Sequence, residues 1–253
     1  MSKIMEDCLK NVRVESDLIG SLEVPADALY GVQTLRGIEN FPISCFHLND
    51  YPLFINGLAM TKLAAAEANY QLGLLSDSQY NGITQACREI LEGKHHEHFP
   101  VDMIQGGAGT TTNMNANEVI ANRALQIMGY PLGKYKYCSP NDHVNCSQST
   151  NDAYPTAIHL GLYATHQEFL KHYVLLIESF EKKAVEFADI LKMGRTQLED
   201  AVPMTLGQTF GAFASILRDE IRNLNFAAEE FLTVNMGATA IGTGICSEPG
   251  YSD

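Results

Sequence analysis

The sequence predicts a mainly α-helical protein whose longest helices form an elongated antiparallel bundle. Two long segments carry the clearest signal, one from Pro155 to about Leu191 and one from Pro203 to about Val234. In both segments apolar residues recur at steps of three, four or seven, the spacing of one buried stripe along a helix. A short connection, KMGRTQLEDAV, joins the two segments. We therefore expect the two helices to lie antiparallel to each other.

The preceding elements follow from local signals. Residues 1 to about 50 contain several glycines and prolines between short apolar pieces, which predicts loops and short strands. Helices are expected in FINGLAMTKLAAAEANYQLG, in SDSQYNGITQACREILEG with Ser76 or Ser78 as its cap, and in NANEVIANRALQIMG, which ends at Gly129. Pro155 and Pro203 are expected in the first turns of the two long helices, where proline is tolerated.

Composition and charge exclude several functional classes. Hydrophobic residues make up 45% of the 253 residues, enough for a folded core, and the net charge of −13 gives no basic stripe for nucleic acid. No apolar run approaches the roughly 18 residues of a membrane span. The N-terminus has no signal peptide pattern, and the six widely spaced cysteines favour free thiols, so we expect a cytoplasmic protein.

Three polar, small-residue segments interrupt the helical pattern: QGGAGTTTNMN at 105–115, SQSTNDAYPT at 147–156 and MGRTQLEDAVPMTLGQ at 193–208. The first two would open helices, where backbone N–H groups and the helix dipole favour an anion. Each segment alone is better explained as a helix cap, or for Arg195 as an ion pair with Glu199 or Asp200. Together they favour a shared site in which uncharged donors bind a carboxylate.

The histidines give weaker signals. The run HHEH at 95–98 lacks the spacing of a metalloprotease helix and follows Gly93, so it predicts a solvated loop and no metal site. His159, His166 and His172 are expected to be packed or surface residues on the first long helix. His143 adjoins the second polar segment, where it could support that loop or be an ordinary core histidine.

The polar segments also carry a family resemblance. QGGAGTTTNMNANEVIANRA, PNDHVNCSQSTNDAYPT and KMGRTQLEDAVPMTLGQ resemble the characteristic regions of the aspartase/fumarase superfamily, and SDLIGSLEVPADALYGVQTLRGIENFPIS resembles its N-terminal region. GGAGTTTNMN and STND are more similar to aspartases than to class II fumarases, which typically carry GSGTQSNMN and SSND. Gln197 stands where other members often have histidine, although some aspartases have glutamine there.

The resemblance implies a fold, an assembly and an activity. It implies an aspartase-like fold, with residues 1–140 as an N-terminal lyase domain and 141–253 as the first part of the central helical bundle domain. It also implies reversible deamination of the dicarboxylate L-aspartate to fumarate and ammonia through an aci-carboxylate intermediate. No organic cofactor is required, although a divalent cation activates some aspartases. The full-length protein would be a homotetramer with active sites built from three subunits and with no nucleic-acid or membrane partner.

By the same resemblance, Thr110, Ser149 and Thr150 would hold the carboxylate on which charge develops. Asn151 would contact the amino group with Gln197 nearby, and Thr196 would bind the other carboxylate. Family members are about twice as long, and their catalytic base is a serine in a later G-S-S-x-M-P-x-K-x-N loop. We therefore expect the 253 residues to have no catalytic base and to be inactive alone. A class II fumarase or a non-catalytic assembly protein are the alternatives.

Overall fold

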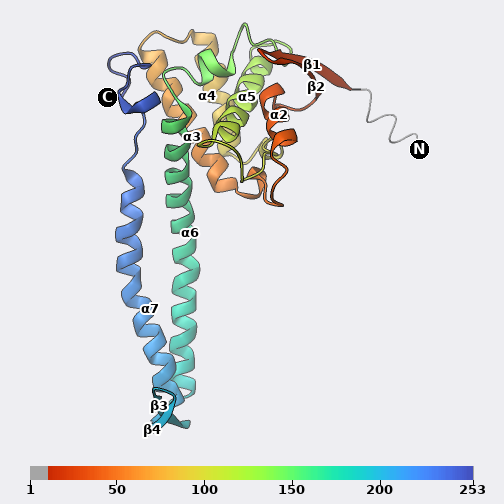
Figure 1. The fold of residues 1–253 in the computed structure, drawn as a ribbon. Helices are drawn as coiled ribbons and strands as arrows, with labels where there is room; N and C mark the ends of the chain where they lie inside the picture. Colours follow the sequence, from red (N-terminus) through yellow and green to blue (C-terminus); the bar gives the residue numbers. More distant parts are fainter. Residues whose placement is uncertain (1–10, 253) are drawn as a thin grey trace, which may run out of the picture. The chain divides into compact units, whose positions relative to one another are not determined.

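The computed structural model describes residues 11–252, and it confirms the predicted mainly helical fold (Figure 1). The elements in chain order are β1 Val12–Asp17, β2 Gly20–Pro25, α2 Val32–Asn40, η1 Leu48–Asp50, α3 Pro52–Gln71, α4 Asp77–Leu91, η2 His96–His98, α5 Thr110–Ile127, η3 Pro140–Val144, α6 Thr150–Glu186, β3 Leu191–Thr196, β4 Glu199–Thr205, α7 Leu206–Glu229, η4 Glu230–Leu232 and η5 Ala240–Gly242.

The described chain divides into two compact units. Unit 1 contains residues 11–161 and 234–252, and unit 2 contains residues 162–233. Helix α6 begins in unit 1 and continues into unit 2. These units are groups of packed elements and not family domains, so the boundary expected between residues 140 and 141 stays a prediction.

Unit 1 is a helical core covered by a small hairpin. Helices α3, α4 and α5 bury a shared apolar cluster whose members include Ile55, Leu58, Ile83, Ile90, Val119, Ile120 and Leu125. Each fully buried side chain of this size contributes about 1.5–3 kcal/mol. Ser76 caps α4 and forms a capping box with Gln79, as the sequence predicts, and Gly129 adopts the left-handed conformation (φ 81) just beyond α5.

Helix α2 was not expected, because its glycines suggested a loop. Gly37 is in fact a packing requirement, since a Cβ there would lie 2.3 Å from the Thr111 side chain on α5. The first N–H groups of α2 are satisfied from α5: Glu118 accepts hydrogen bonds from the backbone N–H groups of Gly31, Gln33 and Thr34 at 2.8–3.0 Å. A buried carboxylate therefore caps α2 from another helix.

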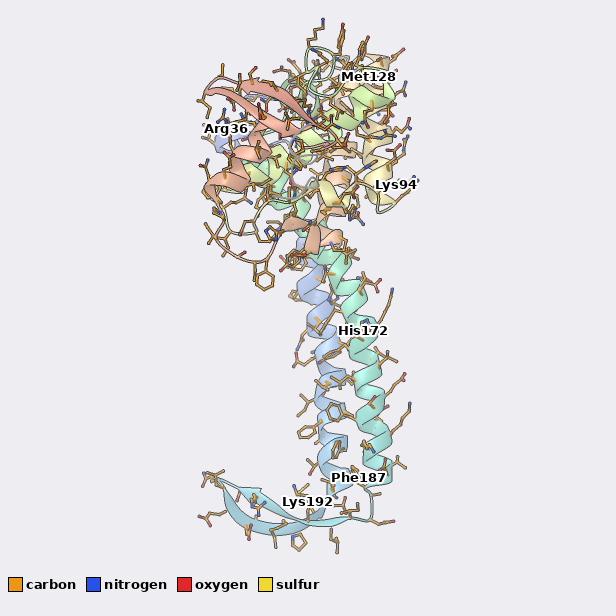
Figure 2. All side chains as sticks on the ribbon, turned by 90° about the vertical axis from the view of Figure 1, so that its right-hand side faces the viewer. Arg36, Lys94, Met128, His172, Phe187 and Lys192 are labelled. Atoms are coloured by element: carbon orange, nitrogen blue, oxygen red, sulfur yellow. The ribbon has the colours of Figure 1, made fainter. Side chains whose placement is uncertain are left out.

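Unit 2 is an antiparallel helix pair. His166 contacts Asn225 and Glu181 pairs with Arg218, so earlier residues of α6 meet later residues of α7. Phe187 and Phe210 pack with ring centroids 5.4 Å apart near the hairpin β3–β4, and Figure 2 shows Phe187 at this end of α6 and Lys192 on the hairpin. Gly207 is required at this end, because a Cβ would lie 2.4 Å from the Ala184 carbonyl oxygen.

The short connection between the long helices is the hairpin β3–β4. Two predictions about the prolines at the starts of these helices were wrong. Pro203 lies in β4, which tolerates proline because each strand of a two-stranded hairpin has a free edge. Pro155 lies inside α6, and the carbonyl of Asn151 that it leaves without a helical partner accepts a hydrogen bond from Asn235 Nδ2 at 3.0 Å.

Two further features complete the fold. The five cysteines within residues 11–252 carry free thiols, as expected, and Cys8 lies outside the described residues. Among residues 11–252, every helix is too short or too polar to cross a bilayer.

Candidate active site

The first polar segment opens α5. The helix begins at Thr110 after Gly109, which has a φ of 86°. A side chain at Gly109 would strike the ring of Tyr154 on α6, because a Cβ would lie 2.3 Å from it. Gln105 satisfies the new helix by accepting from the Thr112 N–H at 2.9 Å and donating to the Thr112 hydroxyl at 2.7 Å. Thr110 stays exposed on the first turn.

The second polar segment opens α6. Ser149 precedes the helix and its carbonyl accepts the N–H of Ala153 at 3.1 Å, so it acts as the cap residue. Asp152 returns a hydrogen bond by accepting from the Ser149 N–H at 2.9 Å. Both Ser149 and Thr150 are partly exposed. Their hydroxyl groups therefore lie at a well-capped helix start with access to solvent.

The starts of α5 and α6 lie against each other in unit 1. Asn113, one turn into α5, donates from Nδ2 to the Thr150 hydroxyl at 3.2 Å. The contact between Gly109 and Tyr154 described above brings the same two first turns together. The structure thus brings Thr110, Ser149 and Thr150 to one region, where the positive ends of two helix dipoles meet uncharged hydroxyl donors.

A segment after α7 contacts this region through Thr239. Asp152 is fully buried, and its second oxygen accepts from the Thr239 N–H at 2.8 Å. Asn151 donates from Nδ2 to the Thr239 carbonyl at 2.8 Å. The Oδ1 atom of Asn151 is the end of its amide that can accept a hydrogen bond. Both oxygens of the buried Asp152 carboxylate accept from backbone N–H groups, so this carboxylate does not engage the hydroxyl groups of Thr110, Ser149 and Thr150.

The third polar segment forms the hairpin of unit 2. Thr196 ends β3, and Gln197 begins the two-residue turn to β4. Both side chains are exposed. Gln197 and Leu198 have positive φ values of 49° and 69°, as the two central residues of a type I′ hairpin turn require. Arg195 pairs with Asp200 at 3.1 Å, which is one of the two ion pairs expected from the sequence.

His143 lies just before the second segment, in η3. Its Nδ1 accepts from the Ser139 N–H at 2.7 Å, and its Nε2 lies 2.9 Å from Gln79 Nε2 on α4. Burial lowers the pKa of His143, so the neutral ring is favoured. The contacts join the loop before α6 to α4, and a role for His143 in supporting the site stays a prediction.

The HHEH segment contains the short helix η2. Among residues 11–252, His95, Glu97 and His98 are the one group that brings three potential metal ligands within 4.8 Å. The Leu29 N–H donates to His98 Nδ1 at 3.5 Å, which leaves the ring proton on Nε2, 3.5 Å from Glu97. His95 lies 3.0 Å from Glu89. Hydrogen bonds thus account for these contacts, and the expected absence of a metal site stays a prediction.

Sequence reasoning missed the buried polar residues beneath the site. Lys62 on α3 contacts Asn145 and Gln148, and Asn113 contacts both Asn145 and Thr150. The available signal was a single lysine within the alanine-rich pattern of α3. Thr239 was also missed, because nothing in the small-residue segment around it indicates a contact with the start of α6.

Comparison with known proteins identifies the family. A family model described as Lyase matches residues 20–253. The chain belongs to this lyase family. It is 59% identical over 240 residues to an aspartate ammonia-lyase of Pseudomonas aeruginosa and 55% identical over 243 residues to that of Escherichia coli K12. These matches cover 94% and 96% of the chain but 51% of each relative, so the chain spans about half the length of the curated relatives it matches.

Solved structures of related lyases share this fold. A fumarate lyase:delta crystallin from Brucella melitensis bound to cobalt matches with a TM-score of 0.91 at 51% identity, over 95% of the chain and 52% of that structure. A class II fumarase from Schistosoma mansoni matches with a TM-score of 0.85 at 35% identity, over 95% of the chain and 50% of that structure. The predicted superfamily and the closer similarity to aspartases are confirmed.

Proposed function

We propose that this lyase-family protein catalyses the reversible deamination of L-aspartate to fumarate and ammonia. The observation that carries the proposal is the pair of helix starts in unit 1 with the hydroxyl groups of Thr110, Ser149 and Thr150. The identity of 55–59% to aspartate ammonia-lyases supports the choice of substrate. The identity to a class II fumarase is lower, at 35%, so fumarate hydration is the less favoured activity.

The chemistry explains why neutral donors suit this reaction. A base removes a proton from C3 of L-aspartate, and the electron pair moves into the adjacent carboxylate to give an aci-carboxylate. Hydroxyl groups and helix N-termini stabilise this added negative charge where it develops. The C2–N bond then breaks, the nitrogen leaves with its electron pair and the C2–C3 double bond forms. Thr110, Ser149 and Thr150 are assigned to this carboxylate.

The remaining roles concern the other end of the substrate. Asn151 uses its Nδ2 on Thr239, which leaves Oδ1 as the acceptor for the substrate ammonium group. From the hairpin β3–β4, Thr196 is assigned to the second carboxylate and Gln197 to the amino group. The reaction needs no organic cofactor, and a divalent cation acts at most as an activator.

The base is the one chemical role that these residues do not fill. The 253 residues contain no G-S-S-x-M-P-x-K-x-N segment, and the residues assigned above carry only hydroxyl and amide side chains. The chain by itself is therefore expected to bind dicarboxylate without turnover.

Assembly is part of the proposed function. Unit 2 exposes large apolar side chains on both helices, including Leu175 and Val185 on α6 and Ile216 and Phe226 on α7. Exposed apolar surface on a helix pair favours association, and we assign it to a homotetramer in the full-length protein. Light scattering after size-exclusion chromatography measures this directly, and a strict monomer would contradict it.

Fragment complementation tests the activity. The chain is co-expressed with the part of the P. aeruginosa aspartate ammonia-lyase that it does not cover, and fumarate formation is followed by ultraviolet absorbance with L-aspartate or L-malate. We expect turnover of L-aspartate by the assembled pair, and its loss in the Thr150→Val variant. Faster turnover of L-malate would show that the protein is a fumarase, and full activity of Thr150→Val would remove the assigned role of this hydroxyl.

A further inference from the structure

A buried lysine lies beneath the candidate site without a role in the proposed chemistry. Lys62 on α3 is 1% exposed, and its Nζ donates to Asn145 Oδ1 at 2.9 Å and to Gln148 Oε1 at 2.8 Å. Burial lowers the pKa of Lys62 to about 7, against the opposing charge of Asp152 on α6. Burying a lysine is costly unless it is well hydrogen-bonded. Its two contacts both lie on the segment that precedes α6.

Asn145 connects this lysine to α5. Besides Lys62, its Oδ1 accepts from Asn113 Nδ2 at 3.1 Å and from Asn117 Nδ2 at 3.2 Å. Asn113 and Asn117 are four residues apart and lie on one face of α5. Helix α3, helix α5 and the loop before α6 therefore meet at a single amide oxygen.

Asn113 extends the network to the site. One hydrogen of its Nδ2 group serves Asn145, and the other serves the Thr150 hydroxyl oxygen at 3.2 Å. A hydroxyl group that accepts on one side keeps its own hydrogen to donate elsewhere. Asn113 is 1% exposed whereas Thr150 is partly exposed, so the acceptor side of this hydroxyl is occupied from the protein interior.

We propose that Lys62 and Asn113 are positioning residues that fix the Thr150 hydroxyl as a hydrogen-bond donor for a substrate carboxylate. Lys62 holds Asn145, Asn145 orients the Asn113 amide, and Asn113 occupies the inner face of Thr150. Neither Lys62 nor Asn113 contacts the substrate. The inference rests on the proposed function for the identity of the ligand, but the orientation of Thr150 can be measured without any ligand.

The first experiment is ligand-free. In the chain labelled at threonine methyl groups, three-bond NMR couplings report the χ1 rotamer of Thr150. We expect one rotamer in the wild type and rotamer averaging in Asn113→Ala and Lys62→Met. Asn122→Ala is the matched control, because Asn122 is also buried on α5 but donates to the Leu29 carbonyl and the Tyr135 hydroxyl. A single unchanged Thr150 rotamer in Asn113→Ala would overturn the proposal, even if Lys62→Met fails to fold.

The second experiment measures succinate affinity in a double-mutant cycle. Asn113→Ala is expected to weaken succinate binding about tenfold, the loss of one well-oriented hydrogen bond to a carboxylate. In a Thr150→Val background, which has no hydroxyl to orient, the same change should have no further effect. An equal loss in both backgrounds would show that Asn113 does not act through Thr150 and would overturn the proposal.

The two experiments separate this inference from the proposed function. If the rotamer of Thr150 depends on Asn113 but the wild-type chain binds no succinate, the ligand assignment of the proposed function fails. In that outcome the positioning of Thr150 by Asn113 is upheld. If succinate binds and the Thr150 rotamer is independent of Asn113, the ligand assignment is upheld and the positioning of Thr150 by Asn113 fails.

Discussion

Replacing Asp152 by alanine should destabilise unit 1 by about 3–5 kcal/mol. The carboxylate is fully buried and accepts from two backbone groups, the Ser149 N–H at 2.9 Å and the Thr239 N–H at 2.8 Å. A hydrogen bond to a charged group contributes about 1.5–3 kcal/mol, and an unpaired buried donor costs a similar amount. The change would also remove the negative charge on α6 that favours protonation of the buried Lys62, which adds to the loss.

The isosteric variant refines this magnitude. Asp152→Asn keeps one oxygen but turns an NH₂ group toward one of the two N–H donors, so it should destabilise by about half as much, about 1.5–2.5 kcal/mol. Asp142→Ala is the control, because Asp142 is an exposed acidic residue of η3. Surface substitutions of that kind usually change stability by less than about 0.5 kcal/mol.

The assay combines global and local measurements. Urea unfolding followed by circular dichroism gives the change in stability, and amide hydrogen exchange reports on the two donors directly. Faster exchange at Ser149 and Thr239 is expected in Asp152→Ala and not in Asp142→Ala. If Asp152→Ala changes the free energy of unfolding by less than about 0.5 kcal/mol, the reasoning about this buried carboxylate is refuted.

Two further predictions concern charge and packing. Because burial lowers the folded pKa of Lys62 from 10.5 to about 7, the folded state is favoured above pH 10.5 and loses this advantage as the pH falls to about 7. The stability of wild type relative to Lys62→Met should therefore rise between pH 7 and 10.5 in urea titrations. A difference in stability that does not change with pH would contradict the lowered pKa of Lys62. Gly57→Ala should destabilise by at least about 1–3 kcal/mol, since a Cβ would lie 2.2 Å from the Ala157 carbonyl oxygen. Gly211→Ala, whose nearest contact would be 3.8 Å, should be neutral or stabilising by up to about 1 kcal/mol in thermal unfolding, and similar losses in both variants would refute the packing argument.

Local signals predicted much of the helical framework. Helices α3 and α4 and the cap at Ser76 follow from apolar spacing and from residue types that act within a few positions of each other. Helix α2 was not predicted, because a glycine such as Gly37 can have two opposite effects on a helix. It weakens a helix by propensity, but it also permits the close approach of Thr111 on α5, which only the tertiary structure reveals.

The hairpin between the long helices lacked its usual signal. A type I′ turn normally uses asparagine or glycine, whereas this turn places Gln197 and Leu198 at positive φ. Pro155 was predicted in the first turn of a helix, because a proline inside a helix is rare unless other groups satisfy the freed carbonyl, but it lies inside α6. Here Asn235, from the segment after α7, supplies that hydrogen bond.

The candidate site was predicted at the level of segments and not of its supporting network. Hydroxyl residues at helix starts are visible in the sequence, and the family resemblance selected Thr110 and Thr150 among them. The contacts of Lys62 with Asn145 and of Asn113 with Thr150 join residues far apart in the chain. No local pattern encodes such pairs, since they depend on how three helices pack.

The most direct test of the central claim is a succinate titration of the chain complemented with the part of the P. aeruginosa relative that it does not match, observed through threonine methyl groups. If neutral donors from three segments bind one dicarboxylate, the methyl signals of Thr110, Thr150 and Thr196 will shift with a common dissociation constant, while that of the buried Thr84 on α4 stays in place. Saturation of Thr110, Thr150 and Thr196 at unrelated succinate concentrations, or no shift at any one of them, would contradict the account.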